Sequence, residues 1–209
     1  MTAHNAPAKY AYSDGDPSHT HEYLIAEVQR FLQRVAPGRV LEIGCGNGSL
    51  AAWIHGQGVD VTGIDTSESG IAQARASHPG IRFEIGSAYD DLAGSFGLFP
   101  AVVSLEVIEH LYDPRLFATR LFNVLDPGGS VCISTPYHGY LKNLALAATG
   151  KMDSHFTALW DGGHIKFWSV ATLGHLLKEA GFIDIQFRRV GRLPVLAKSL
   201  VAFARKPGP

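Results

Sequence analysis

Two carboxylates and an imidazole lie close together in the stretch SLEVIEHLYDP, residues 104–114. Glu106, Glu109 and His110 follow directly after the apolar run AVVSL. Residues three and four apart share a face of a helix, so the three side chains would point the same way if all of them lay on one helix; alternatively, Glu106 belongs to the end of the preceding strand. Such a group could bind a metal ion, act as a catalytic base with its orienting partners, or form a solvated helix start. Which of these three roles the group has depends on the strands and helices that lie beside it.

The bulk composition describes a chain of one domain without strong charge. Its 209 residues suit a single large domain, and 46% of them are hydrophobic. A net charge of −1 argues against nucleic acid or an anionic membrane as a partner held by charge. The two cysteines, Cys45 and Cys132, favour a reducing compartment. No apolar run reaches the length of a membrane span, so we expect a cytoplasmic protein; the sequence does not indicate its oligomeric state.

Apolar runs that alternate with helical patterns predict an α/β fold with a parallel sheet. The runs of strand type are residues 39–44, 60–65, 81–86, 101–106 and 130–135. The segments with helical periodicity or helix caps are residues 22–35, 49–58, 67–80 and 114–129. Because the strands are apolar almost throughout, both faces of the sheet should be covered by helices.

Residues 136–168 break this alternation. The segment holds three histidines and two tryptophans, and insertions of this length inside a compact domain are usually functional. We therefore expect a substrate lid there. A serine-capped helix over 169–182 follows, and then two strands, 183–190 and 197–206, that suit an antiparallel pair at the sheet edge. The chain then forms one domain, 1–209, with the polar residues 1–20 as a flexible arm.

A glycine-rich turn in VLEIGCGNGSL joins the first strand to the next helix. Gly44, Gly46 and Gly48 allow unusual backbone angles and a close approach of a ligand. Asp65 ends the next strand about 20 residues later, where nucleotide folds place an acid for ribose hydroxyls. The spacing is G-x-G-x-G rather than the G-x-G-x-x-G of dinucleotide-binding proteins, and no Walker lysine follows. The sequence thus predicts a nucleoside cofactor without a pyrophosphate.

Four segments, VLEIGCGNGSLA, VTGIDTSESGI, VVSLEVIEHL and LDPGGSVCISTP, resemble the successive motifs of class I S-adenosylmethionine-dependent methyltransferases. The resemblance is greatest to the branch that includes ubiquinone-biosynthesis O-methyltransferases, and it covers roughly residues 38–136. It implies a Rossmann-like, seven-stranded, mostly parallel sheet with helices on both faces and an antiparallel last strand pair. It also implies S-adenosylmethionine as the cofactor.

The same resemblance implies roles for single residues in holding the cofactor. The implied positions are Glu42, Gly44, Cys45 and Gly46 for the methionine half, Asp65 for the ribose, Thr66, Ser87, Ala88 and Asp90 for the adenine, and Leu105 and Glu106 for the sulfonium side. Ser87 departs from the family pattern, because many relatives carry an acid there for the adenine amine.

Methyl transfer to a hydroxyl group needs alignment of the reactants and removal of a proton. Histidine is the usual base near neutral pH, and His138, His155 and His164 follow the fifth strand at the edge where ligands bind. Each of them could instead be a loop residue with a structural hydrogen bond. Trp160 in the same segment could wall an aromatic or apolar substrate.

Glu106, Glu109 and His110 also resemble the E-x-x-E-H metal motif of small-RNA 3′-end 2′-O-methyltransferases. His164, in GGHIKFWS, resembles the place of that family's later histidine ligand. Two carboxylates with two imidazoles would suit Mg²⁺, Mn²⁺ or Zn²⁺, and the oxygen ligands favour hard cations. The alternatives are a motif that only shapes the pocket floor, or a capped helix start with Glu109 on its solvated face.

These observations predict an S-adenosylmethionine-dependent O-methyltransferase that acts on a small hydroxylated metabolite, such as a quinol, phenol or enol. Metal-assisted 2′-O-methylation of RNA is a rival that the near-neutral charge disfavours. A cofactor-binding module without catalysis is another. A nicotinamide-dependent oxidoreductase is a further rival, which the misplaced third glycine disfavours.

Overall fold

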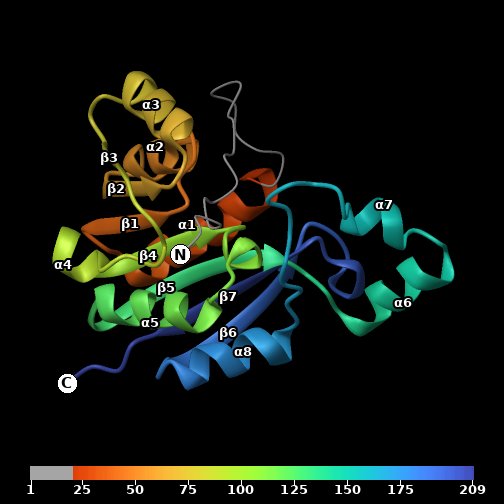
Figure 1. The fold of residues 1–209 in the computed structure, drawn as a ribbon. Coiled ribbons are helices and arrows are strands. Elements are labelled where there is room, and N and C mark those ends of the chain that lie inside the picture. Colours follow the sequence, from red (N-terminus) through yellow and green to blue (C-terminus); the bar gives the residue numbers. More distant parts are fainter. Residues whose placement is uncertain (1–20) are drawn as a thin grey trace, which may run out of the picture.

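The computed structural model describes residues 21–209, and its strands form one seven-stranded sheet in the order β3-β2-β1-β4-β5-β7-β6 (Figure 1). The strands are β1 (Arg39–Ile43), β2 (Asp60–Asp65), β3 (Arg82–Ile85), β4 (Phe99–Leu105), β5 (Leu125–Pro136), β6 (Ile183–Val190) and β7 (Ser199–Arg205). β1 to β5 are parallel, and β7 runs antiparallel to both β5 and β6. The predicted Rossmann-like sheet with its antiparallel last pair is confirmed.

Helices cover both faces of the sheet (Figure 1). One face carries α1 (His21–Val35), α2 (Ser49–His55) and α3 (Glu68–Ser77). The other face carries α4 (Leu92–Phe96), α5 (Pro114–Val124) and α8 (Val170–Glu179). None of the described helices is long and apolar enough to cross a membrane.

Apolar side chains on both faces of the central strands build two cores. Val40 and Leu41 are neighbours in β1, and both are fully buried although they point to opposite faces. Val40 belongs to the core under α1, α2 and α3, whereas Leu41 belongs to the core under α5 and α8. Each such burial stabilises the fold by about 1.5–3 kcal/mol, which is why these strands read as continuous apolar runs.

Side-chain caps set the starts of the helices that flank the site. Asp113 accepts a hydrogen bond from the Leu116 amide at 2.9 Å, and Pro114 occupies the first turn of α5. Ser169 and Thr172 form a capping box at the start of α8.

The helix that begins at Pro114 ends before the Pro-Gly-Gly turn, as predicted, but the fifth strand begins earlier than predicted. α5 ends at Val124, and β5 begins at Leu125 rather than at residue 130. Leu125 is fully buried and pairs with Phe99 at the start of β4, so this tertiary contact draws the segment into the sheet. Gly128, at φ 80°, then takes a backbone angle that a continued helix does not allow.

The insertion at residues 136–168 contains two short helices, α6 (Tyr140–Ala148) and α7 (Met152–Phe156), which project from the body of the molecule (Figure 1). Neither helix contains a buried residue. At the base of the insertion Tyr137 and Trp168 form a bridge, and the His138 amide donates to the Trp168 carbonyl at 3.0 Å. The role of lid and the single-domain boundary stay predictions, and the predicted arm, 1–20, lies outside the described residues.

Candidate active site at the carboxyl edge of the sheet

The glycine turn between β1 and α2 has a backbone that only glycine adopts with ease. Gly44, Gly46 and Gly48 have φ angles of 82°, 53° and 79°. A Cβ atom on Gly44 would lie 2.3 Å from a methyl carbon of Val107, and one on Gly48 would lie 2.6 Å from the Phe83 ring. The turn is therefore packed tightly against the strands beneath it.

Asp65 at the end of β2 ties this turn in place. Its Oδ2 accepts from the Gly46 amide at 2.8 Å, and its Oδ1 accepts from the Ser67 amide at 2.7 Å. Burial raises the pKa of this carboxyl, while the amide hydrogen bonds oppose that rise. Each carboxylate oxygen has a further lone pair, so Asp65 can hold the turn and still accept from a ligand hydroxyl.

Glu42 and Cys45 form a buried wall beside the turn. Glu42 is 4% exposed, and its Oε2 has no hydrogen-bond partner among the described residues. Burial, followed by the charge of Asp65, raises the pKa of Glu42 to about 8. Burial likewise raises the pKa of the Cys45 thiol, which makes it a neutral wall rather than a nucleophile.

Replacing Glu42 by glutamine should stabilise the ligand-free protein at pH 8. The carboxyl pKa is about 8 in the folded protein and 4.5 as the ordinary value, so the folded state binds the extra proton between these values. Stability contributed by Glu42 is thus present below pH 4.5 and lost as the pH rises toward 8. A neutral amide should remove this loss in the free energy of unfolding, on the order of 4 kcal/mol at pH 8. Urea unfolding between pH 5 and 8 measures it.

The exposed Glu68 at the start of α3 provides the matched control for this experiment. Glu68→Gln should leave both the stability and its pH dependence unchanged. If the free energy of unfolding of Glu42→Gln fell with rising pH as steeply as that of the wild type, burial of Glu42 would not be the cause of the pH dependence.

The positions implied for the adenine follow the ends of β2 and β3. Thr66 is exposed, and Ala88 is buried. The Ser87 amide donates to Asp90 Oδ2 at 2.7 Å, and the Ser87 hydroxyl accepts from the Tyr89 amide at 3.2 Å. Asp90 and Ser87 therefore order a turn beside β2, and their predicted contact to an adenine stays a prediction.

Of the two placements left open for Glu106, the shared helix face is wrong, because Glu106 lies at the end of β4 and not on a helix with Glu109. β4 ends at the buried Leu105, and Glu106 has a φ of 55°, an uncommon angle for a residue with a side chain. Only Ile108–His110 form a helical turn, of the 3-10 type. Ser134 of β5 accounts for the difference, because its Oγ donates to Glu106 Oε1 at 2.7 Å and accepts from the Glu106 amide at 3.0 Å. Burial raises the pKa of Glu106.

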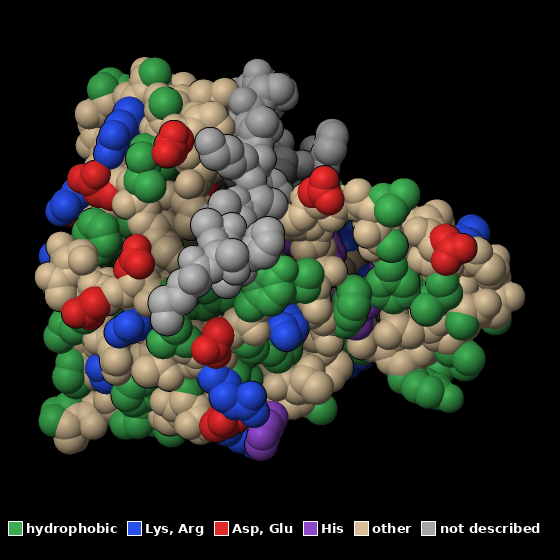
Figure 2. Space-filling model, in the orientation of Figure 1, with side chains coloured by type: hydrophobic (Ala, Val, Ile, Leu, Met, Phe, Trp, Pro, Cys, Tyr) green, Lys and Arg blue, Asp and Glu red, His purple; other side chains and the backbone are tan. Residues whose placement is uncertain are grey.

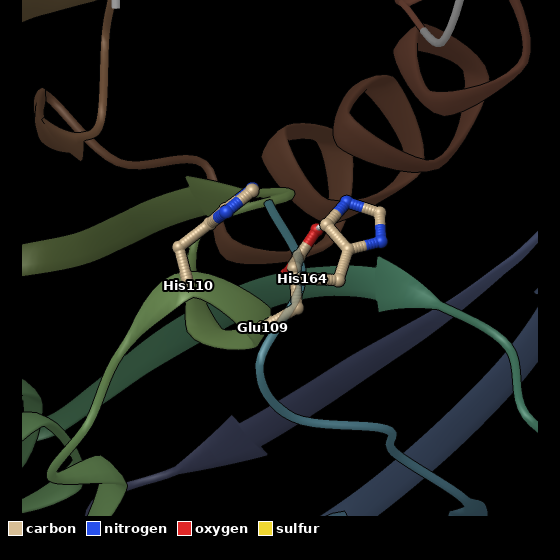
Figure 3. A group of neighbouring side chains, drawn as sticks. All are labelled: Glu109, His110 and His164. Atoms are coloured by element: carbon tan, nitrogen blue, oxygen red, sulfur yellow. Dashed lines mark ion pairs between the residues drawn. The ribbon is translucent and has the colours of Figure 1, made fainter. Parts of the chain in front are cut away.

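Glu109, His110 and His164 bring their side chains together at this edge (Figure 3). One ligand atom from each lies within 4.8 Å of the others, and Glu106 is not part of this group. The amides of Ile165 and Lys166 donate to the Glu109 carbonyl at 2.9 and 3.0 Å, which holds the strand-like segment with His164 against Glu109.

Glu109 is fully buried, so the alternative of a capped helix start with Glu109 on its solvated face is wrong. Neither carboxylate oxygen has a well-aligned hydrogen-bond partner in the described part of the chain, although the buried Thr135 hydroxyl lies close enough to lower the Glu109 pKa. The nearest base is His164, whose Nε2 lies 3.9 Å from Glu109 Oε1. Burial, and then the charge of Glu106, raises the Glu109 pKa well above its ordinary value. A buried carboxyl without a donor costs free energy unless a proton or a cation occupies it.

The two imidazoles of this group are suited to bind a cation as neutral ligands. His110 Nδ1 lies 2.9 Å from the Gly162 carbonyl, so this nitrogen is the donor and Nε2 is the acceptor nitrogen of the ring. Burial lowers the pKa of His110, and burial followed by His110 lowers that of His164 to about 4. Glu109, His110 and His164 therefore offer one oxygen and two nitrogen ligands.

The structure places His138 and His155 in a separate aromatic group. Their ring centroids lie 5.7 Å apart, and Phe156 and Phe167 pack on His138. Burial, and then the charge of Lys142, lowers the His138 pKa to about 4. In the space-filling view, histidine side chains appear in the recess between the body and the projecting α6–α7 lobe (Figure 2). The role of base stays a prediction for His138, His155 and His164.

Sequence reasoning missed the contribution of Ser134 and of the main chain at residues 162–166. Both positions lie within quoted segments, Ser134 in LDPGGSVCISTP and Gly162 in GGHIKFWS, but the residue types do not reveal these roles, because Ser134 acts through its place beside β4 and Gly162 through its carbonyl.

Comparisons with known proteins agree with this fold. A family model described as "Methyltransferase domain" matches residues 18–186. The ubiquinone biosynthesis O-methyltransferase of Thiobacillus denitrificans is 35% identical over 153 residues, which cover 70% of this chain and 65% of that protein. The corresponding enzyme of Azorhizobium caulinodans is 34% identical over 153 residues, covering 69% and 58%. The match thus spans less than two thirds of each of these two relatives.

A solved structure supports the same fold at lower sequence identity. Phosphoethanolamine N-methyltransferase 2 of Haemonchus contortus, in complex with S-adenosyl-L-methionine, has a TM-score of 0.63 and 18% identity. The alignment covers 87% of this chain and 52% of that one. Because the family model matches most of the chain and several ubiquinone biosynthesis O-methyltransferases are 32–35% identical to it, this chain belongs to the class I S-adenosylmethionine-dependent methyltransferase family, in the branch of the ubiquinone-biosynthesis O-methyltransferases.

Proposed function

We propose that the chain methylates a hydroxyl group of a small metabolite, such as a quinol, phenol or enol, with S-adenosylmethionine as methyl donor. A divalent cation at Glu109, His110 and His164 would assist. The observation that carries the proposal is the buried, unpartnered Glu109 carboxyl with two neutral imidazoles at the strand edge that also holds the glycine turn. The names of the relatives support O-methylation.

The residues at the glycine turn fit the cofactor. S-adenosylmethionine, when bound, supplies a methyl group activated by a sulfonium. The glycine backbone permits close approach, and Asp65 can accept from ribose hydroxyls. We assign Glu42, Gly44, Cys45 and Gly46 to the methionine half, Thr66, Ser87 and Ala88 to the adenine, and Leu105 and Glu106 to the sulfonium side.

The residues at the second group fit a divalent cation. When bound, Mg²⁺, Mn²⁺ or Zn²⁺ supplies a Lewis acid that lowers the pKa of a hydroxyl group. The orphaned oxygens of Glu109 point to a cation, and the Gly162 carbonyl fixes the His110 tautomer as outer hydrogen bonds do in metal sites. Glu106, whose Oε1 accepts from the Ser134 hydroxyl, would be a further ligand of the cation at the same edge of the sheet.

Residues of the chain would do the remaining work of orientation and proton transfer. Trp160 lies with its ring centroid 5.9 Å from that of His110, where it can orient a substrate ring. The neutral pair His138 and His155 lies in the same insertion and can accept the hydroxyl proton. The projecting helices α6 and α7 would exclude water from the reacting groups.

The rival functions are less well supported. Methylation of RNA is not favoured, because the net charge of −1 offers little attraction for a phosphate backbone. The match to a methyltransferase family disfavours an oxidoreductase and a non-catalytic module.

A methyl-transfer assay tests the proposal. The full chain, supplied with S-adenosylmethionine labelled in its methyl group and with Mg²⁺, should label members of a panel of catechols, quinols and enols. A single-stranded RNA oligonucleotide should remain unlabelled. S-adenosylhomocysteine, but not NAD, should raise the Tm. Stabilisation by NAD alone, or labelling of RNA alone, would overturn the proposal.

A further inference from the structure

Two cationic side chains lie beside the methyl-transfer edge without an acidic partner. Lys142 belongs to α6, and Arg192 belongs to the connection between β6 and the short 3-10 helix η2 (Pro194–Leu196). Neither of them forms an ion pair with an acid within residues 21–209. They are here called the cationic pair, and the methyl-transfer proposal assigns no role to either.

The main chain brings the cationic pair to this edge of the sheet. The Lys142 amine donates to the Tyr137 carbonyl at 2.8 Å, and Tyr137 comes directly after the last residue of β5. Gly191, at φ 87°, turns the chain out of β6 toward η2, which packs against α6. Arg192 thus comes close enough to Lys142 for its charge to lower the Lys142 pKa, after the larger effect of burial.

The Lys142 amine lies among groups from three other elements. Burial, and then the charge of Lys142, lowers the pKa of His138 after β5 and of His155 on α7. The charge of Lys142 also reaches Glu106 at the end of β4. Because the interaction of two charges falls with distance, these effects place the amine in the recess under α6 and α7, where the histidines lie.

This recess carries a surplus of positive charge. His138 and His155 are neutral at pH 7, because burial lowers both pKa values. Glu106 is the acid whose charge reaches Lys142, and even a fully charged Glu106 would balance only one member of the cationic pair. Two cations held together without a counter-ion cost free energy, and such arrangements cluster at functional sites. A ligand with one negative charge would balance the surplus.

The recess also reaches the proposed metal group. Burial, then the charge of His110 and then that of His155, lowers the pKa of His164. His155 therefore lies near both the cationic pair and His164, and one small molecule in the recess can contact both. The anion subsite and the site of methyl transfer would then hold two ends of the same substrate.

We infer that the cationic pair binds a carboxylate on the methyl acceptor, so that the chain prefers hydroxylated substrates that are also acids. The Lys142 amine has two further protons beside the one on the Tyr137 carbonyl, and the exposed Arg192 offers a planar fork that matches a carboxylate. This inference rests on the proposed methyl transfer and adds the class of its substrate.

Titration calorimetry on the full chain, with Mg²⁺ and saturating S-adenosylhomocysteine, tests the inference. It compares 3,4-dihydroxybenzoate with its neutral amide, 3,4-dihydroxybenzamide. We expect the acid to bind at least about tenfold more tightly than the amide, because hydrogen bonds between charged groups are roughly twice as strong as neutral ones. Lys142→Met and Arg192→Gln should each lower this ratio of affinities, and the double variant should bring it to about one.

Lys142→Arg keeps the charge and should restore most of the ratio. Lys178→Met is the matched control, because Lys178 is an exposed lysine of α8, and this variant should keep the wild-type ratio. A damaged fold would weaken the binding of both ligands alike, whereas loss of the anion subsite should weaken that of the acid alone.

The outcomes separate this inference from the methyl-transfer proposal. Equal affinities of acid and amide in the wild type, a wild-type ratio in the double variant, or no binding of the acid would overturn the anion subsite. If the acid binds with the expected preference but accepts no labelled methyl group, the proposed methyl transfer is wrong and the anion subsite stands.

Discussion

Replacement of Glu109 by glutamine is expected to lower kcat/KM for methyl transfer by about a thousandfold, without lowering the Tm of the metal-free protein. A bound cation supplies several kcal/mol of stabilisation to a developing oxyanion, and removal of its carboxylate ligand forfeits most of that. The fold should survive, because glutamine has nearly the same shape as glutamate and the Glu109 carboxyl group makes no well-aligned hydrogen bond within the described chain. Steady-state kinetics and thermal unfolding of the same sample measure both effects.

Metal removal should reproduce the kinetic effect in the unaltered chain. Activity should disappear in excess chelator and return with Mg²⁺, Mn²⁺ or Zn²⁺. His164→Ala should prevent this rescue and leave cofactor affinity nearly intact, since His164 lies outside the glycine turn. His175→Ala is the control, because His175 is an exposed histidine of α8 that lies outside the group. Full activity of a metal-stripped sample in excess chelator would contradict the proposed metal site and favour a histidine base instead.

Replacement of Asp65 by alanine is expected to weaken the binding of S-adenosylhomocysteine by at least about a hundredfold. Two ribose hydroxyls would lose a charged acceptor, and each such hydrogen bond contributes about 1.5–3 kcal/mol. The variant also releases the amides of Gly46 and Ser67, so the turn itself should become less ordered. Calorimetric titration gives the affinity, and amide exchange at Gly46 reports the order of the turn.

Asp60→Ala is the matched control for this experiment. Asp60 begins the same strand, β2, at the end away from the turn. It should therefore leave the affinity unchanged. If Asp65→Ala also binds S-adenosylhomocysteine like wild type, the ribose assignment is wrong.

Local signals in the sequence determined the sheet and the glycine turn. Val40, Leu41 and their equivalents are apolar at consecutive positions, and only a strand covered on both faces buries every one of them. Gly44 and Gly48 at a strand end likewise have few alternatives, since their backbone angles exclude other residues. The cofactor was predicted from the family motifs, which occur along these strands and turns in the order that the fold requires.

The tertiary structure alone decided which side chains of the opening motif meet. The helical spacing predicted one face for Glu106, Glu109 and His110, but Ser134 on the adjacent strand holds Glu106 in a left-handed conformation away from that face. Main-chain hydrogen bonds between segments far apart in the sequence bring His164 to Glu109, a neighbourhood that the family resemblance implied but that spacing along the chain did not predict. Burial then set the protonation of these groups, and burial depends on every element packed around them. Spacing along the chain carries no information about such contacts, because they depend on the distances between atoms after folding.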